Sequence, residues 1–149
     1  MNIQLSDVSH IIQLSIAPVF LLSGIGPQLI VLTNRLARII DRSRGLEELL
    51  HHADTADKTE YLAEIEILYR RAHQINYAIT LSTACALLVS LIIVVLFLGD
   101  ALGLALDRLI AVLFVVAMLA LIGSYSFLLR EIFIATRSLS LRHIFKYRQ

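Results

Sequence analysis

The sequence has little with which to build a catalytic or metal centre. It contains one cysteine, two prolines and no tryptophan among 149 residues. The lone Cys85 excludes an intrachain disulfide, and its apolar neighbours indicate a small packing residue. No zinc motif, phosphate-binding glycine loop or nucleophile elbow is present. We therefore expect no catalytic residue, no metal site and no cofactor, and we expect the protein not to be an enzyme.

Three long stretches contain no Lys, Arg, Asp or Glu. They cover residues 11–34, 74–99 and 109–129, which are 24, 26 and 21 residues long. About 20 apolar residues in a helix cross the hydrocarbon core of a bilayer. The chain is 58% hydrophobic, whereas soluble domains are about 45–50% apolar. The pattern predicts an all-α membrane protein with three transmembrane helices, forming a single membrane domain over residues 1–149.

Basic residues are distributed unevenly around these runs. The first ten residues contain no Lys or Arg, so the first run is expected to be a retained anchor and not a cleaved signal. Segments 35–73 and 130–149 hold twelve of the thirteen basic residues, and the 100–108 loop holds one. Because cytoplasmic loops are enriched in Lys and Arg, we predict an external N-terminus and a cytoplasmic C-terminus. The basic tail, residues 130–149, either lies on the anionic inner leaflet or only sets the topology.

The charged segment 35–73 carries two apolar stripes at helical spacing. The first is formed by Leu36, Ile39, Ile40, Leu46, Leu49 and Leu50, and the second by Tyr61, Leu62, Ile65, Leu68, Ala72 and Ile75. Polar residues 51–58 separate them, and Thr55 or Asp57 is a candidate helix cap. We predict that the first two transmembrane helices continue into an antiparallel cytoplasmic hairpin.

The middle of the first run is unusually rich in helix-disrupting residues. Two prolines and two glycines lie within ten positions, and such residues kink or open a helix. Open backbone is tolerated in a membrane only next to protein or water. The stretch therefore indicates either a pore or gate segment or a tightly packed static kink. The pore or hinge candidates are Ala17, Pro18, Ser23, Gly24, Gly26, Pro27 and Gln28.

Charged and polar residues follow the inner end of the first run. The inner-mouth candidates are Asn34, Arg38, Asp41 and Arg42, and the outer-mouth candidates are Asp7 and His10. Asp41 is placed to pair with Arg38 within the helix, or with Arg70 or Arg71 across the hairpin. The simpler interpretation is a set of basic anchors at the membrane surface. The adjacent Arg130 and Glu131, at the inner end of the third run, invite a similar pairing.

The second and third runs have the features of packing helices. Ala78, Ser82, Ala86 and Ser90 repeat every four residues, and Ala117, Ala120, Gly123 and Ser124 form a similar ridge. Small residues allow helix backbones to approach closely. Neither run has a charged residue in its middle, which argues against a proton pump or an ion-coupled carrier.

Two segments point to a known family. Residues 16–22, IAPVFLL, and residues 32–42, LTNRLARIIDR, resemble the opening of the bacterial membrane protein family called domain of unknown function 2721. Arg70-Arg71-Ala72 and the stretch from Leu129 to Leu139 are also similar to it. The resemblance covers nearly the whole chain and implies a bacterial inner-membrane protein. The family brings no assigned activity and no catalytic residues.

Three functions remain open on these grounds. Three helices leave small-residue ridges unpaired, so we expect a homo-oligomer with closed symmetry. The leading interpretation is an ion channel lined by the first helix. The main alternative is a non-conducting scaffold or regulator whose hairpin binds a partner protein, and a membrane enzyme is the least favoured. The expected partners are the lipid bilayer, further copies of the chain and inorganic ions, with no nucleic acid.

Overall fold

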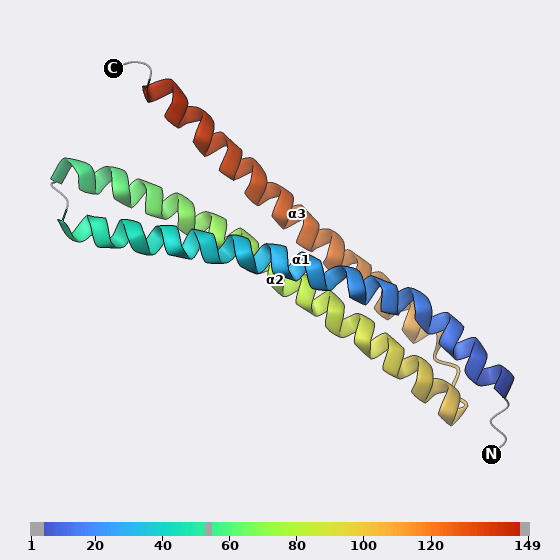
Figure 1. Cartoon of the computed structure of the whole chain (residues 1–149). Helices are drawn as coiled ribbons and strands as arrows, with labels where there is room; N and C mark the ends of the chain where they lie inside the picture. Colours follow the sequence, from blue (N-terminus) through green and yellow to red (C-terminus); the bar gives the residue numbers. More distant parts are fainter. Residues whose placement is uncertain (1–4, 53–54, 147–149) are drawn as a thin grey trace. The chain divides into compact units, whose positions relative to one another are not determined.

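The protein consists of three long α-helices. The computed structural model describes the backbone of residues 5–52 and 55–146, and the side chains of residues 12–51 and 57–135. Helix α1 covers Leu5–His52, α2 covers Thr55–Leu102 and α3 covers Asp107–Lys146 (Figure 1). The all-α prediction is therefore confirmed. Asp7, His10, Thr55 and the tail beyond residue 135 lie outside the described side chains.

Each helix contributes to two compact units. The first unit comprises Met1–Leu29 and Leu81–Gly123, and the second comprises Ile30–Thr80 and Ser124–Gln149. The second unit contains the arms of α1 and α2 that meet near residues 52 and 55, where the two helices run antiparallel (Figure 1). It also contains the charged residues discussed below.

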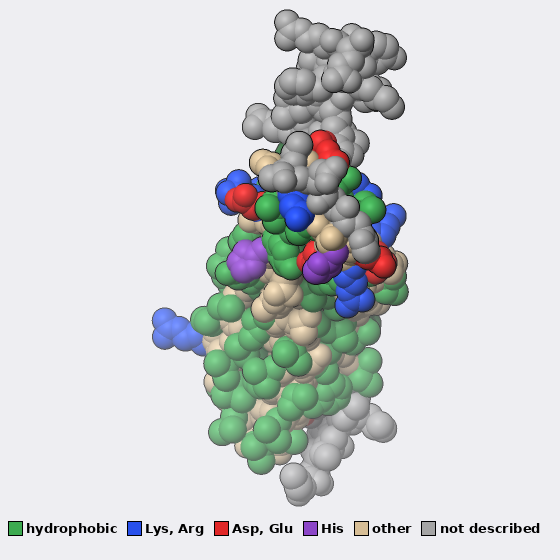
Figure 2. Space-filling view, turned by 90° about the vertical axis from the view of Figure 1, so that its left-hand side faces the viewer, with side chains coloured by type: hydrophobic (Ala, Val, Ile, Leu, Met, Phe, Trp, Pro, Cys, Tyr) green, Lys and Arg blue, Asp and Glu red, His purple; other side chains and the backbone are tan. Residues whose placement is uncertain are grey.

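All three helices are long and apolar enough to cross a membrane. The candidate spans lie within Ile12–His51, Asp57–Leu102 and Asp107–Ala135. The face in Figure 2 carries a broad area of hydrophobic side chains. An apolar surface of this extent is what a multi-pass membrane protein presents to lipid.

Helix α2 ends in a tight turn within the first unit. Gly103 has φ +63°, the Gly103 N–H donates to the Asp100 carbonyl at 3.1 Å, and the Leu104 N–H donates to the Gly99 carbonyl at 2.8 Å. These two bonds form a Schellman motif, which satisfies the last carbonyls of a helix and favours glycine in the left-handed position. The turn shortens the link that the sequence predicted at residues 100–108, since α3 begins at Asp107.

The packing of the second unit follows a seven-residue repeat. The core of the second unit includes Leu32, Ile39 and Leu46 of α1, with Leu68 and Ile75 of α2. On each helix the successive core residues named here are seven positions apart, which is the spacing of a left-handed coiled coil. The core of the first unit contains Ile25, Cys85, Val89, Ala117 and Leu121. The stripes predicted over 36–50 and 61–75 thus supply much of the second core.

The small-residue ridges of α2 and α3 pack against each other within the chain at Ser124 and Gly123, so the expectation that these residues are left unpaired is wrong. Within the second unit, the buried Ser124 hydroxyl donates to the Ala78 carbonyl at 2.8 Å. In the first unit, a Cβ added at Gly123 would lie 3.0 Å from Leu81 Cδ1. Both observations indicate a close approach of the helix backbones that larger residues would prevent.

The prolines of α1 do not interrupt it. Pro18 and Pro27 both lie inside a helix that is continuous from Leu5 to His52. The opening expected from the sequence is therefore not a break in helical structure. A Cβ at Gly24 or Gly26 would meet nothing within 4 Å, so neither glycine is needed for close packing inside the chain.

Candidate functional site

A buried carboxylate joins all three helices in the second unit. The Glu131 side chain is 0% exposed, although α3 has only just left the apolar run that ends at Leu129. Burying an ionised carboxylate is costly unless it is paired and hydrogen-bonded. The surroundings of Glu131 therefore have to supply positive charge.

The heptad spacing of α3 explains why a glutamate is buried here. Ser124 and Glu131 are seven residues apart, so they lie on the same stripe of the helix. Both are fully buried, and Ser124 is already in contact with α2 through Ala78. The packing stripe of α3 thus carries the Glu131 carboxylate between α1 and α2.

Two arginines neutralise this carboxylate from different helices. Arg71 of α2 donates from Nε and Nη2 to Glu131 Oε1, at 3.1 and 2.8 Å. Arg35 of α1 places Nη2 3.3 Å from Oε2. This Arg35 contact is an ion pair without hydrogen-bond geometry, since Oε2 accepts no hydrogen bond among the described side chains. Arg71 is therefore the stronger of the two partners.

The cluster of Arg35, Arg71 and Glu131 links three helices through ion pairs. Arg35 and Arg71 are 28% and 21% exposed at their side chains, so both guanidinium groups retain some contact with the surroundings. The cluster holds one negative and two positive charges, and the described residues contain no group of His, Cys, Asp and Glu side chains that could hold a metal ion. Its geometry suits fixing the register of three helices at one level.

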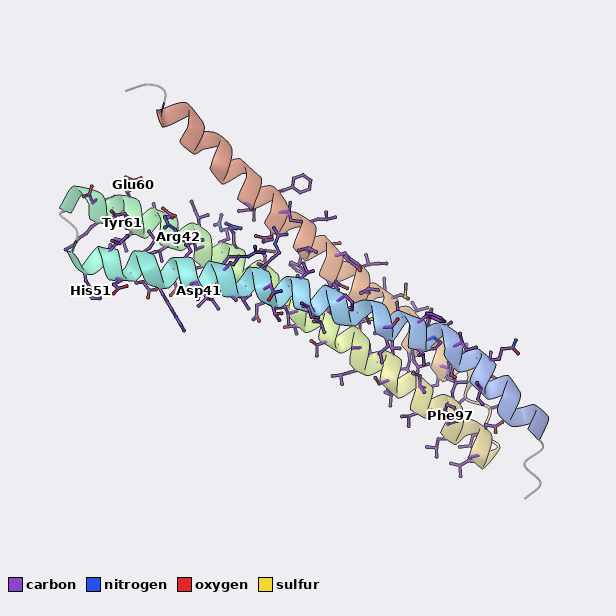
Figure 3. The ribbon with its side chains drawn as sticks, in the orientation of Figure 1. Asp41, Arg42, His51, Glu60, Tyr61 and Phe97 are labelled. Atoms are coloured by element: carbon purple, nitrogen blue, oxygen red, sulfur yellow. The ribbon has the colours of Figure 1, made fainter. Side chains whose placement is uncertain are left out.

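A second ion pair holds the arms of α1 and α2 together. Arg42 donates from Nε and Nη2 to Glu64 Oε1 at 3.1 and 2.9 Å, and Figure 3 shows Arg42 between the two helices. The Tyr69 hydroxyl donates to Glu47 at 3.3 Å. These contacts are more exposed than the Glu131 cluster, and exposed ion pairs contribute about 0–1 kcal/mol.

The inner-mouth candidates separate into two groups. Asn34, Arg38 and Asp41 are exposed, whereas Arg42 is directed to Glu64 on α2. Asp41 forms no ion pair among the described side chains, and Arg71 pairs with Glu131 in its place. The pairings considered for Asp41 from the sequence are therefore not those of the structure. Asp7 and His10 lie outside the described side chains.

The pore and hinge candidates of the first unit also separate. Pro18 and Gln28 are buried, and the other five, Ala17, Ser23, Gly24, Gly26 and Pro27, are exposed. The Ser23 hydroxyl donates to the Phe20 carbonyl at 2.7 Å, so it already has a partner on its own helix. The small residues of α1 thus face away from α2 and α3.

Glu131 and Glu64 are the site residues whose roles the sequence revealed least. Glu131 drew attention only for its neighbour Arg130, which is exposed and outside the buried cluster. The missed signal was the seven-residue spacing of Ala117, Ser124 and Glu131, because it places a carboxylate on a packing ridge. Nothing in the local sequence distinguishes Glu64 from the neighbouring Glu60 and Glu66.

Comparison with known proteins gives a family and no activity. A family model described as protein of unknown function (DUF2721) matches residues 15–141. No curated protein and no solved structure matches the chain. The matched range contains Arg35, Arg71 and Glu131, together with the exposed small residues of α1.

Proposed function

We propose that this chain, which belongs to the DUF2721 family, is a homo-oligomeric membrane protein. In this proposal the α1 helices of the copies surround an ion-conducting path. One observation supports the proposal above the others. An exposed seam runs along α1 in alternating steps of four and three residues. Its members are Gln13, Ala17, Phe20, Gly24, Pro27, Val31, Asn34, Arg38 and Asp41.

This outer seam has the spacing of a helix-packing surface. Alternating four- and three-residue steps are the pattern by which one helix packs along another. The inward stripe of α1 uses the same spacing and is occupied within the chain. This second seam is unoccupied within the chain and carries Ala17, Gly24 and Pro27. Small residues suit close packing against α1 helices of further copies.

Burial of the spans favours several copies around a path. Only 22%, 22% and 17% of the apolar windows of α1, α2 and α3 are buried within the chain. All three helices expose large apolar side chains that suit lipid, such as Ile30, Leu87 and Leu119. On α1 most of these side chains lie outside the exposed seam. A closed ring of copies places α1 inside and α2 and α3 outside.

The seam residues give the path a constriction and a charged mouth. Phe20 is 73% exposed and lies between Ala17 and Gly24 on the seam. A ring of such side chains would form a hydrophobic constriction of the kind that gates by dewetting. Asn34, Arg38 and Asp41 would line the end of the path next to the hairpin. These residues include one positive and one negative side chain, so they do not indicate whether cations or anions would pass.

Accessibility of single cysteines tests this arrangement. In a Cys85→Ala background, Ala17→Cys and Gly24→Cys should react roughly tenfold or more faster with a charged, water-soluble thiol reagent than Leu119→Cys, because only a hydrated thiol ionises. Leu119 is a matched control, since it is exposed on a helix that the proposal places against lipid. The rates are measured in liposomes by mass spectrometry.

The buried Ile25, next to Gly24 in sequence, provides a second control. Ile25→Cys should remain protected, because Ile25 packs in the core of the first unit. Equal, slow rates at Gly24→Cys and Leu119→Cys would contradict a hydrated seam.

A scaffold is the second candidate, and the hairpin favours it. Leu49, Leu62 and Tyr69 are at least half exposed in a segment that we propose lies in the cytoplasm. Exposed apolar residues on a hydrated surface suit a partner protein. In that case the α1 cysteines would be protected, and substitution of these three residues would release the partner.

A further inference from the structure

The arginines near residue 74 of the second apolar run and residue 129 of the third differ in what they contact. Arg71 is bound to Glu131, whereas Arg70 and Arg130 are exposed and form no ion pair within the described part of the chain. Because Arg71 and Glu131 are in contact, their sequence neighbours Arg70 and Arg130 lie at about the same level. Two uncompensated positive charges therefore lie where the second and third apolar runs end.

An open hollow lies beside one of these arginines. It has a volume of about 470 Å³ and is lined by Ser126, Leu129, Arg130, Phe133 and Ile134 of α3. Its walls are mainly apolar, and Leu129 and Phe133 expose more than half of their side chains. The hollow thus combines one free guanidinium group with apolar contact area.

We propose that Arg130, with Arg70 at the same level, binds the headgroup phosphate of an anionic phospholipid whose acyl chain lies against the apolar wall of this hollow. Guanidinium groups match phosphate oxygens in geometry and charge. Glu131, the carboxylate next to Arg130 in the sequence, is buried and already neutralised, so it does not repel an anion. The lipid comes from the leaflet on the hairpin side of the bilayer.

The lack of tryptophan in the chain allows a local test. Tyr125→Trp places one fluorophore at an exposed position one turn from Leu129, outside the hollow lining. Its quenching is measured in vesicles of phosphatidylglycerol and phosphatidylcholine in which only one lipid is brominated. We expect phosphatidylglycerol to be enriched about fivefold beside this fluorophore, since a basic residue near an anionic surface contributes about that factor.

Two double variants with equal loss of charge separate site binding from bulk attraction. Arg70→Gln with Arg130→Gln should reduce the enrichment to about onefold, because it removes both phosphate ligands. Arg42→Gln with Arg44→Gln should preserve the enrichment, because both residues lie away from the level of Arg70 and Arg130. Arg35 contacts Glu131 and marks that level on α1. Arg42 and Arg44 are seven and nine residues further along the helix, or about 10 and 13 Å. A further control, Phe114→Trp, lies deeper in the apolar run of α3 and should report no enrichment.

Three results would overturn the lipid site. They are equal quenching of the Tyr125→Trp fluorophore by the two lipids, an equal loss of enrichment in both double variants, and an enrichment that survives Arg70→Gln with Arg130→Gln. Circular dichroism of each variant checks that the helices are intact, so that a loss of enrichment is attributed to the missing arginines.

Discussion

Replacing Arg71 by alanine is expected to lower the free energy of unfolding by about 3–5 kcal/mol. Arg71 provides both hydrogen bonds to Glu131 Oε1, and Glu131 is fully buried. Its removal leaves the carboxylate with Arg35 alone, at 3.3 Å and without hydrogen-bond geometry. Unfolding is measured by circular dichroism during titration of the purified protein from a mild detergent into sodium dodecyl sulfate.

Neighbouring arginines provide matched controls for this effect. Arg70→Ala should change the stability by less than about 0.5 kcal/mol, because an exposed side chain without a partner contributes little. Arg42→Ala should cost at most about 1 kcal/mol, because its pair with Glu64 is solvent-exposed. The loss of stability in Arg35→Ala should lie between the losses in Arg42→Ala and Arg71→Ala.

A double variant distinguishes an uncompensated charge from lost packing. Arg71→Met with Glu131→Met removes both charges and keeps the volume, so it should recover most of the stability lost in Arg71→Met alone. Equal losses for Arg70→Ala and Arg71→Ala, or a double variant no more stable than Arg71→Met, would contradict the role assigned to the Glu131 cluster.

Replacing Leu46 by alanine is expected to destabilise the paired arms of α1 and α2 by about 3 kcal/mol. Leu46 is 1% exposed and lies in the core of the second unit. Truncation removes apolar burial and leaves a cavity, a combination that costs about 2–5 kcal/mol in the core of a water-soluble domain. The measurement is hydrogen exchange of the amide groups in residues 36–50 and 61–75, followed by mass spectrometry.

Leu49 is the control for Leu46, since it lies three residues away on the same helix and is half exposed. Leu49→Ala should raise the exchange rates of these amides by less than about fivefold, whereas Leu46→Ala should raise them by about a hundredfold. Similar exchange rates for the two variants would contradict the packing of the α1 and α2 arms around Leu46.

The helices and most packing faces were predictable from the sequence because both depend on local spacing. The three uncharged runs indicated the spans. Of the two predicted stripes, Ile39, Leu46, Ile65, Leu68 and Ile75 became core, whereas Ile40, Leu49 and Leu62 are exposed. The continuity of α1 through Pro18 and Pro27 was not predictable from the sequence. Each proline removes one backbone hydrogen bond, and the remaining hydrogen bonds on either side can keep the helix continuous.

The charged site was less predictable, because it depends on which helix faces lie together. Arg71 has acidic candidates on α1 and α3, and only the packing of α3 against α2 brings Glu131 within 2.8 Å of it. Asp41, which the sequence made prominent, is exposed. Similarly, the exposed seam of α1 was visible only after the inward positions, including Gln28, were known.

Electrical recording tests the central claim most directly. Purified protein, shown to be a folded oligomer by circular dichroism and cross-linking, is reconstituted in planar bilayers with Gly24→Cys in the Cys85→Ala background. We expect discrete single-channel currents that a charged thiol reagent blocks, because Gly24 lies on the proposed lining. The Leu119→Cys protein should conduct and remain unaffected by the reagent. Absence of current from the folded oligomer at every voltage, pH and membrane tension applied would contradict the proposal.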